Sequence, residues 1–122
     1  MRRAALLTAA ILLGACSVQV SSGSGYVLRE GAIDGPNQME ATIPATIQVE
    51  NAGEYPHTLV VTNQRGEVLA ATGLVDPGGN ADLQVDLAAG IYVFSCRIVS
   101  QDDDGNLIDH FEQGMHRTVT VG

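Results

Sequence analysis

Short apolar segments separated by turn residues are the feature that most limits what this chain can fold into. In residues 81–87 the apolar side chains of Leu83, Val85 and Leu87 alternate with polar ones, which is typical of a strand with one wet face. Clusters such as D-G-P-N in residues 34–37 and D-P-G-G-N in residues 76–80 are turn signals. No segment has convincing helical periodicity. The pattern predicts an all-β sandwich of seven to eight strands.

The turn signals divide the chain into candidate strands. Strands are expected over residues 26–33 (interrupted at Gly31), 42–50, 57–63, 67–72, 81–87, 91–98 and 117–121. Pro44 indicates that the start of the strand over residues 42–50 is an edge position or a break, because proline cannot donate a hydrogen bond to a neighbouring strand. For residues 67–73 a short helical turn stays open as an alternative.

The N-terminal residues are predicted to be a leader rather than part of the fold. Arg2 and Arg3 precede an apolar run that is too short to span a bilayer as a permanent helix. The run ends in L-G-A-C, which resembles a bacterial lipobox with Cys16 as the lipidated residue. Residues 1–15 are then a lipoprotein signal peptide, residues 16–25 the lipidated cysteine with a flexible Ser/Gly tether, and residues 26–122 the folded domain. An ordinary secretory signal is the alternative.

The acidic balance limits the partners. The formal charge is −8, and loss of residues 1–15 with their two arginines would change it to −10. Such a charge repels nucleic acid and anionic lipid, and it favours steering toward a basic partner. Plain solubility would account for the same charge. With no tryptophan, three tyrosines and two phenylalanines, the chain also has little to offer as a stacking platform for bases or sugars.

Cysteine, histidine and methionine gather in the C-terminal part of the chain. If Cys16 carries lipid, Cys96 is a lone thiol in an exported protein, where cysteines normally pair. A small buried hydrophobe or a disulfide with Cys16 would explain Cys96 alone. His110 and Met115 follow it, however, and His57 supplies a second imidazole upstream. Two imidazoles, a thiolate and a long axial thioether are the ligand set of electron-transfer copper.

Two other features of this region weigh less. His116 competes with His110, but strand alternation turns it away from the side that Met115 faces. The acidic stretch D-D-D-G-N in residues 102–106 suggests a calcium loop, yet Ser100 and Phe111 stand where such a loop needs carboxylates. A solvated hairpin tip is the better interpretation of this stretch.

Both segments resemble the cupredoxins of the plastocyanin–halocyanin type. The resemblance is carried by residues in three groups: Asn51, Gly53, Pro56 and His57; Gly90, Tyr92, Phe94 and Cys96; and His110, Gly114 and Met115 before an alternating V-T-V strand. It extends loosely over nearly all of the chain after the leader. In these proteins the second histidine follows the cysteine after only a few residues, whereas here thirteen residues, Arg97 to Asp109, lie between them.

The resemblance implies an eight-stranded Greek-key sandwich with one type 1 copper at one end. His57 and His110 would bind through ring nitrogens, Cys96 through sulfur and Met115 axially. Asn51 would tie the two ligand loops together through hydrogen bonds from its side chain to the backbone.

The expected function is therefore that of a membrane-anchored, extracytoplasmic copper protein. It would be a monomer that shuttles single electrons between redox proteins, and a partner with a basic docking face would suit its charge. No catalytic triad, phosphate-binding loop or recognisable carboxylate pair indicates an enzyme. Two alternatives remain: a lipoprotein that delivers or stores copper, and a metal-free structural or interaction lipoprotein with a cupredoxin-like fold.

Overall fold

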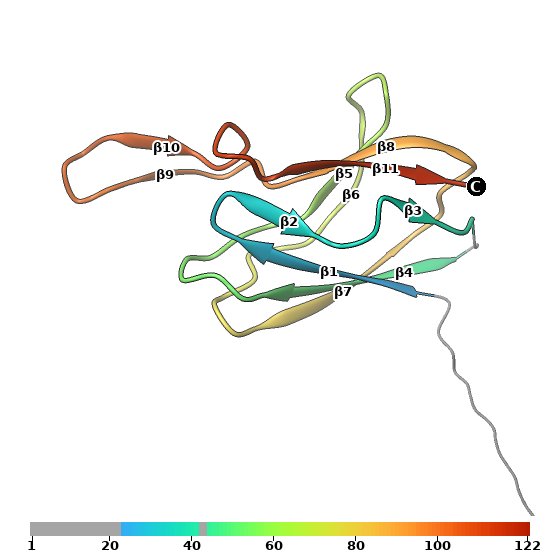
Figure 1. Ribbon diagram of the computed structural model, residues 1–122, viewed down its shortest axis with the longest axis horizontal. Helices are drawn as coiled ribbons and strands as arrows, with labels where there is room; N and C mark the ends of the chain where they lie inside the picture. The colour runs from blue at the N-terminus through green and yellow to red at the C-terminus, as the bar shows by residue number, and fades with distance from the viewer. Residues whose placement is uncertain (1–22, 42–43) are drawn as a thin grey trace, which may run out of the picture.

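The protein is described by a computed structural model that covers residues 23–41 and 44–122. The predicted signal peptide, the lipidation site Cys16 and most of the predicted tether lie outside the described residues. Every regular element within the described ranges is a β-strand, so the all-β prediction is confirmed (Figure 1). In the same residues no helical segment has the length and hydropathy to cross a bilayer.

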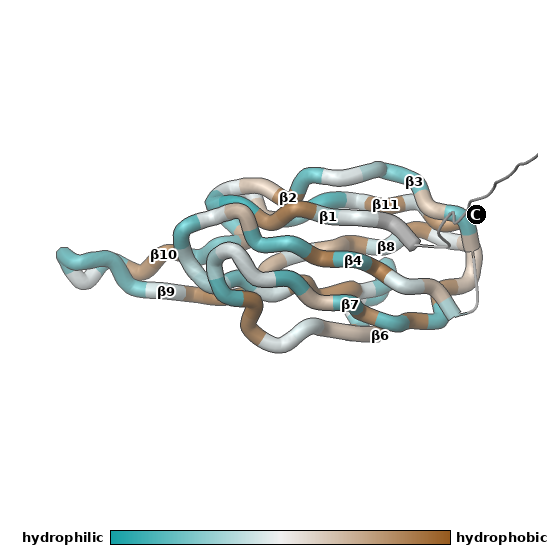
Figure 2. Tube along the Cα trace, turned by 90° about the horizontal axis from the view of Figure 1, so that it is seen from below, coloured by the Kyte–Doolittle hydropathy of each residue, from teal (hydrophilic) through white to brown (hydrophobic). Residues whose placement is uncertain are grey.

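Two sheets and one projecting hairpin make up the fold. The strands are β1 Gly23–Arg29, β2 Ala32–Asp34, β3 Gln38–Met39, β4 Ala45–Asn51, β5 Val60–Thr62, β6 Val68–Ala71, β7 Asn80–Val85, β8 Gly90–Ser95, β9 Val99–Gln101, β10 Leu107–Asp109 and β11 His116–Val121. One sheet has the order β2-β1-β4-β7 and the other β3-β11-β8-β5-β6, while β9 and β10 pair only with each other. The chain passes repeatedly from one sheet to the other, and the sheets face each other as a sandwich (Figures 1 and 2).

The core lies between the two sheets and follows the pleat of the strands. In β4, Ala45, Ile47 and Val49 are buried and alternate with less buried residues. Val85 and Leu87 face inward at the end of β7, as their alternation with polar residues predicts. The sheets are further locked by an edge-to-face contact between the rings of Tyr26 and Phe94, whose centroids lie 5.0 Å apart.

Most predicted strands are confirmed, with changes at their ends. The first strand begins earlier than expected, because β1 starts at Gly23 and pairs in parallel with β4. The expected strand over residues 57–63 shrinks to β5, and His57 forms only an isolated bridge with Val75. Residues 67–73, for which a short helical turn was the alternative, contain strand β6. Within residues 23–41 and 44–122 eleven strands replace the expected seven or eight, because several of them are only two or three residues long.

The hairpin β9–β10 is the inserted stretch between Cys96 and His110. It projects from the end of the sandwich opposite the C-terminus (Figure 1). At its tip the Asp102 carboxylate accepts hydrogen bonds from the backbone N–H groups of Asp104 and Asn106, and Gly105 has a positive φ of 85°. Because this carboxylate already closes the turn, the hairpin-tip interpretation is confirmed.

Candidate metal centre

The loop between β4 and β5 presents His57, and Asn51 holds this loop in shape. The Asn51 side chain is fully buried and donates to the backbone carbonyls of Tyr55 and Val75, both at 2.8 Å. Its carbonyl oxygen accepts from the N–H of Gly53 at 2.8 Å. Asn51 was expected to tie the two ligand loops together. Its partners instead lie in its own loop and at Val75, so it fixes only the segment that carries His57.

The backbone of His57 is also tied on both sides. Its N–H donates to the carbonyl of Val75 at 3.1 Å, and its own carbonyl accepts from Val75 at 2.8 Å. The imidazole is fully buried. Its Nε2 lies 2.8 Å from the Glu30 carboxylate, at the turn between β1 and β2.

Two backbone hydrogen bonds link Cys96 to Met115 and Met115 to His110. Cys96 follows β8 directly, and its N–H donates to the carbonyl of Met115 at 3.0 Å. The N–H of Met115 donates in turn to the carbonyl of His110 at 3.0 Å. Gly114, at φ 115°, lets the chain turn between the histidine and the methionine. The three side chains therefore approach one another from one rigid turn beside the end of β8.

Four buried side chains gather at this end of the sandwich. His57, Cys96 and His110 each offer a ligand atom, and these three atoms lie within 4.8 Å of one another. The two Nδ1 atoms are 3.2 Å apart, and Cys96 Sγ lies 3.6 Å from His110 Nδ1. Ligand atoms bound to one metal at about 2.0–2.3 Å are separated by roughly 3.3–3.8 Å in trigonal or tetrahedral sites. The residues present therefore fit a metal ion held by two imidazoles and a thiolate.

Met115 completes the donor set chemically. It is 1% exposed and lines the same pocket as His57 and His110. Two imidazoles and a thiolate with a nearby thioether are softer than the carboxylate sets that bind calcium or magnesium, and they suit copper. The β4–β5 loop thus brings His57 to the residues that follow β8 and precede β11, at one end of the sandwich.

The remaining ring nitrogen of His110 is held by the inserted hairpin. Ser100 in β9 places its Oγ 2.9 Å from His110 Nε2. Burial, followed by the nearby His57, lowers the pKa of His110 below its usual value, although Glu30 and Asp109 act in the opposite direction. A lowered pKa favours the neutral imidazole, which is the form that binds metal.

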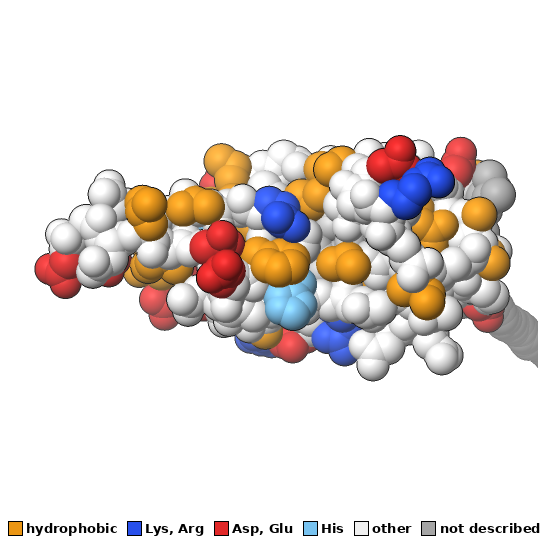
Figure 3. Space-filling model, turned by 90° about the horizontal axis from the view of Figure 1, so that it is seen from above, with side chains coloured by type: hydrophobic (Ala, Val, Ile, Leu, Met, Phe, Trp, Pro, Cys, Tyr) orange, Lys and Arg blue, Asp and Glu red, His pale blue; other side chains and the backbone are white. Residues whose placement is uncertain are grey.

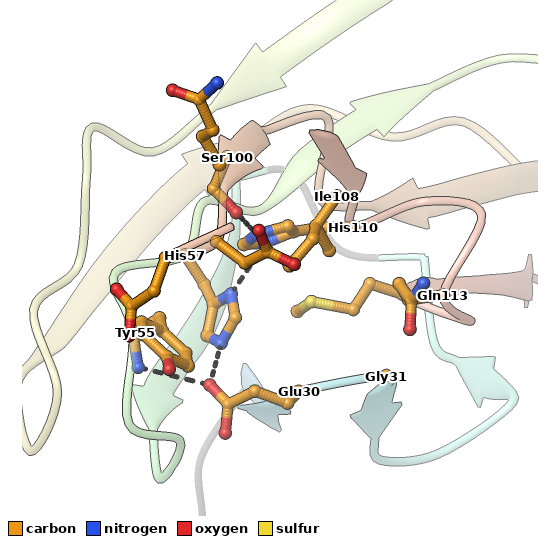
Figure 4. A pocket seen from close by; sticks show the side chains of 12 residues that line it. Glu30, Gly31, Tyr55, His57, Ser100, Ile108, His110 and Gln113 are labelled. Carbon is orange, nitrogen blue, oxygen red and sulfur yellow. Dashed lines mark hydrogen bonds and ion pairs between the residues drawn. The ribbon is translucent and has the colours of Figure 1, made fainter. Parts of the chain in front are cut away.

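A pocket of about 390 Å³ adjoins the metal-binding cluster (Figure 4). It lies between the β1–β2 turn, the loop of His57 and the hairpin, and Ser100, Ile108 and Gln113 belong to its lining. Glu30 and His57 point toward one another at one side of it (Figure 4). The side chains of the cluster are thus buried, but the cluster borders a cavity on one side.

His116 does not join the cluster, as its place in the strand predicts. Its exposed ring stacks on that of Phe111, with centroids 4.6 Å apart, and the guanidinium of Arg97 lies 4.5 Å from the Phe111 centroid on the ring face. Each of these three residues follows a candidate ligand in the sequence, so the stack covers the outer side of the ligand turn.

Figure 3 shows one face of the molecule, with acidic side chains at the outer end of the hairpin and hydrophobic ones exposed along it.

Sequence reasoning missed Glu30 and Ser100, the two side chains that hold the outer nitrogens of the imidazoles. Neither lies in a motif, and each reaches its histidine only through the tertiary fold. The local signal was limited to Gly31, whose φ of 79° marks the turn in which Glu30 stands.

Among the comparisons with known proteins, the matches come from solved structures and concern the fold. Neither models of protein families nor curated proteins match this sequence. Among solved structures, a reduced auracyanin from Roseiflexus castenholzii is 19% identical, with a TM-score of 0.63 and coverage of 85% of this chain and 99% of that one. An azurin from Methylomonas sp. strain J is 13% identical, with a TM-score of 0.63 and coverage of 84% and 99%. A purple cupredoxin from Nitrosopumilus maritimus is 17% identical, with a TM-score of 0.54 and coverage of 81% and 99%.

The chain therefore has the cupredoxin fold, a β-sandwich, as the resemblance implied. Its buried cluster of two histidines and a cysteine fits one type 1 copper ion.

Proposed function

We propose that this protein is an exported, lipid-anchored type 1 copper protein that carries single electrons between redox proteins and is not an enzyme. The observation that supports this most directly is the convergence of one ligand atom each from His57, His110 and Cys96 within 4.8 Å of one another, with all three residues buried. Met115 lines the same pocket and would supply the thioether donor.

The surrounding residues favour electron transfer because they restrict movement of the ligands. Copper bound there supplies a one-electron couple, since thiolate and thioether stabilise Cu(I) while imidazole serves both oxidation states. His57 is bridged to Val75 through its backbone, and Cys96 and Met115 are hydrogen-bonded to each other. Ligands fixed in this way change little on loss or gain of an electron, which lowers the barrier to transfer.

The direction of β1 supports an anchor on the far side from the metal. β1 begins at Gly23 and ends at Arg29, beside Glu30 at the metal-binding end. Its seven residues span about 20–23 Å at about 3.3 Å per residue. A tether from lipidated Cys16 would thus enter at the opposite end of the sandwich and leave the copper end facing away from the membrane. In cells, the full chain should be found in the membrane fraction and Cys16→Ala should be released from it.

The partner would be a redox protein with a basic docking face, met by a monomer of this chain. The net charge of −8 and the acidic tip of the hairpin support electrostatic attraction to such a face. Exposed Val99 and Leu107 on the hairpin add apolar contact area close to His110. Transfer to a basic partner should slow as ionic strength rises, because salt screens exposed charges.

The first experiment is a titration of the soluble form, residues 17–122, with Cu(II) beside Cys96→Ser. Visible absorption and EPR spectra would follow the titration. We expect an intense thiolate-to-copper charge-transfer band that saturates at one equivalent and is absent from the variant. A colourless protein would contradict the proposal, and no bound copper at all would favour a metal-free interaction protein.

Copper delivery is a second candidate, favoured by the pocket of about 390 Å³ that borders His57, His110 and Met115. A ligand set open on one side can release its metal to a chelator or an acceptor protein. Dissociation of copper into an excess of a strong chelator separates the two functions. Retention over hours supports an electron carrier, whereas loss within seconds supports delivery.

A further inference from the structure

We infer that Glu30 is a positioning residue for the metal centre: its carboxylate holds His57 in the tautomer that binds copper and favours Cu(II) over Cu(I). This rests on the proposed function, since it concerns the same site. It assigns a role to a residue outside the ligand set, on a separate strand-to-strand turn.

The carboxylate of Glu30 is bound by the same loop that carries His57. Its Oε2 lies 2.8 Å from His57 Nε2. The same carboxylate accepts hydrogen bonds from the backbone N–H groups of Glu54, at 2.9 and 3.0 Å to its two oxygens, and Tyr55, at 3.2 Å. It therefore receives donors from three residues of one loop, which fixes it relative to the imidazole.

The backbone around Glu30 is shaped to admit this carboxylate. A Cβ on Gly53 would collide with both Glu30 carboxylate oxygens. The side chain of Glu30 is 43% exposed, so it lies at the rim of the site, whereas the His57 ring that it contacts is fully buried. The Glu30 carboxylate thus links the buried imidazole of His57 to the surface of the protein.

The hydrogen bonds of the cluster determine where each imidazole proton lies. A carboxylate can only accept, so His57 must donate from Nε2, and its Nδ1 is then left with a lone pair directed at the cluster. In the metal-free protein the neighbouring His110 Nδ1, 3.2 Å away, donates to that lone pair. His110 Nε2 is then the acceptor for the hydroxyl of Ser100. His57 is therefore already in its metal-binding tautomer, and only His110 must move a proton when copper binds.

The charge of Glu30 acts on the metal through His57. The N–H groups of Glu54 and Tyr55 and the ring of His57 all lie within hydrogen-bond distance of the Glu30 carboxylate, and such donors stabilise its charged form. A carboxylate that accepts from a ligating histidine raises the basicity of that ligand. Added negative charge stabilises the dipositive ion more than the monopositive one, so the protein should hold Cu(II) more tightly relative to Cu(I).

The first test compares Glu30→Gln with Glu54→Gln in the copper-loaded protein. Both remove one carboxylate from the same rim, but the Glu54 side chain is exposed and the described contacts of Glu54 to Glu30 use only its backbone N–H. We expect Glu30→Gln to weaken Cu(II) binding by about 10–100-fold. If the ratio of Cu(II) to Cu(I) affinity falls tenfold, the reduction potential rises by about 59 mV. Equal potentials and affinities in the two variants would overturn the electrostatic part of the inference.

The second test uses the metal-free protein and therefore does not depend on copper binding. Nitrogen-15 NMR should find His57 protonated at Nε2 in the wild type and in Glu54→Gln, and a mixture of tautomers in Glu30→Ala. If His57 in Glu30→Ala stays wholly in the Nε2–H form, Glu30 does not position it. A wild type that binds no copper but keeps this NMR result would reject the proposed function while leaving the positioning role of Glu30 intact.

Discussion

Replacement of Gly114 by alanine should damage the turn that separates His110 from Met115. Gly114 has φ 115°, a conformation that L-residues rarely adopt, and a Cβ there would collide with the carbonyl oxygen of Gly31. That carbonyl belongs to the backbone of the β1–β2 turn and cannot rotate away as a side chain would. Two turns that frame the metal centre would thus have to separate.

The cost has two parts that can be estimated separately. A non-glycine residue in such a backbone conformation costs about 1–3 kcal/mol, and forced backbone shifts around an added methyl cost about 1–3 kcal/mol more. The lower entropy of the unfolded alanine variant offsets about 0.4–1 kcal/mol of this. Taken at the middle of each range, these contributions lower the free energy of unfolding by about 3 kcal/mol. At roughly 4 °C per kcal/mol for a domain of this size, Tm should fall by roughly 12 °C.

Gly66→Ala is the matched control, and urea and thermal unfolding of the metal-free proteins is the assay. Gly66 also has a positive φ, 81°, but a Cβ there would meet nothing within 4 Å. Gly66→Ala should lower the free energy of unfolding by only about 1 kcal/mol, which is the cost of the positive φ less the stabilisation from the lower entropy of the unfolded chain. If the two variants lose the same stability, the close approach of Gly114 to Gly31 does not matter and the reasoning is wrong.

Three further substitutions test other contacts. Asn51→Ala should lower the free energy of unfolding by about 2–4 kcal/mol in urea titrations, because one buried and two partly buried hydrogen bonds of about 1 kcal/mol each are lost and their backbone partners are left unsatisfied. Met115→Leu should change stability by less than about 1.5 kcal/mol, but voltammetry should find a shifted reduction potential, since the thioether donor tunes it. Burial raises the pKa of Tyr26 from 10.0 to about 12, although Arg117 opposes this. The folded state thus favours the protonated phenol, so stability present below pH 10 should be lost as pH rises toward 12, and this loss should be absent from Tyr26→Phe.

The local patterns of this chain were enough to predict the class of fold and to pick out candidate ligands that the structure brings close together. Alternation in residues 81–87 depends only on which face of one strand is wet, so it is visible without the rest of the molecule. The donor types of His57, Cys96, His110 and Met115 are likewise a property of the residues themselves. The ends of the strands were harder to predict from the sequence, because the pairing of Gly23 with β4 depends on a partner about twenty residues away.

The contacts around the ligands could not be predicted, because they join separate parts of the chain. Glu30 reaches His57 from the β1–β2 turn, and Asn51 reaches Val75 across another loop. In each case the sequence offers an ordinary turn or strand-end residue. Only the packing of the loops decides which buried nitrogen or carbonyl it meets.

The long separation of Cys96 and His110 is where the sequence departs most from the proteins it resembles, and the structure explains how the ligands still meet. Val99 pairs with Asp109 at the base of the hairpin, and the next hydrogen bond runs from the N–H of His110 to the carbonyl of Ile98 at 3.0 Å. Residues 99–109 therefore leave and return at one point. Their ends are closed by strand pairing, so the insertion adds length without moving the imidazole away from the thiolate. If the closed hairpin of residues 99–109 is left out, only Arg97 and Ile98 separate Cys96 from His110. This is comparable to the few residues that separate the cysteine and the second histidine in the proteins that the chain resembles.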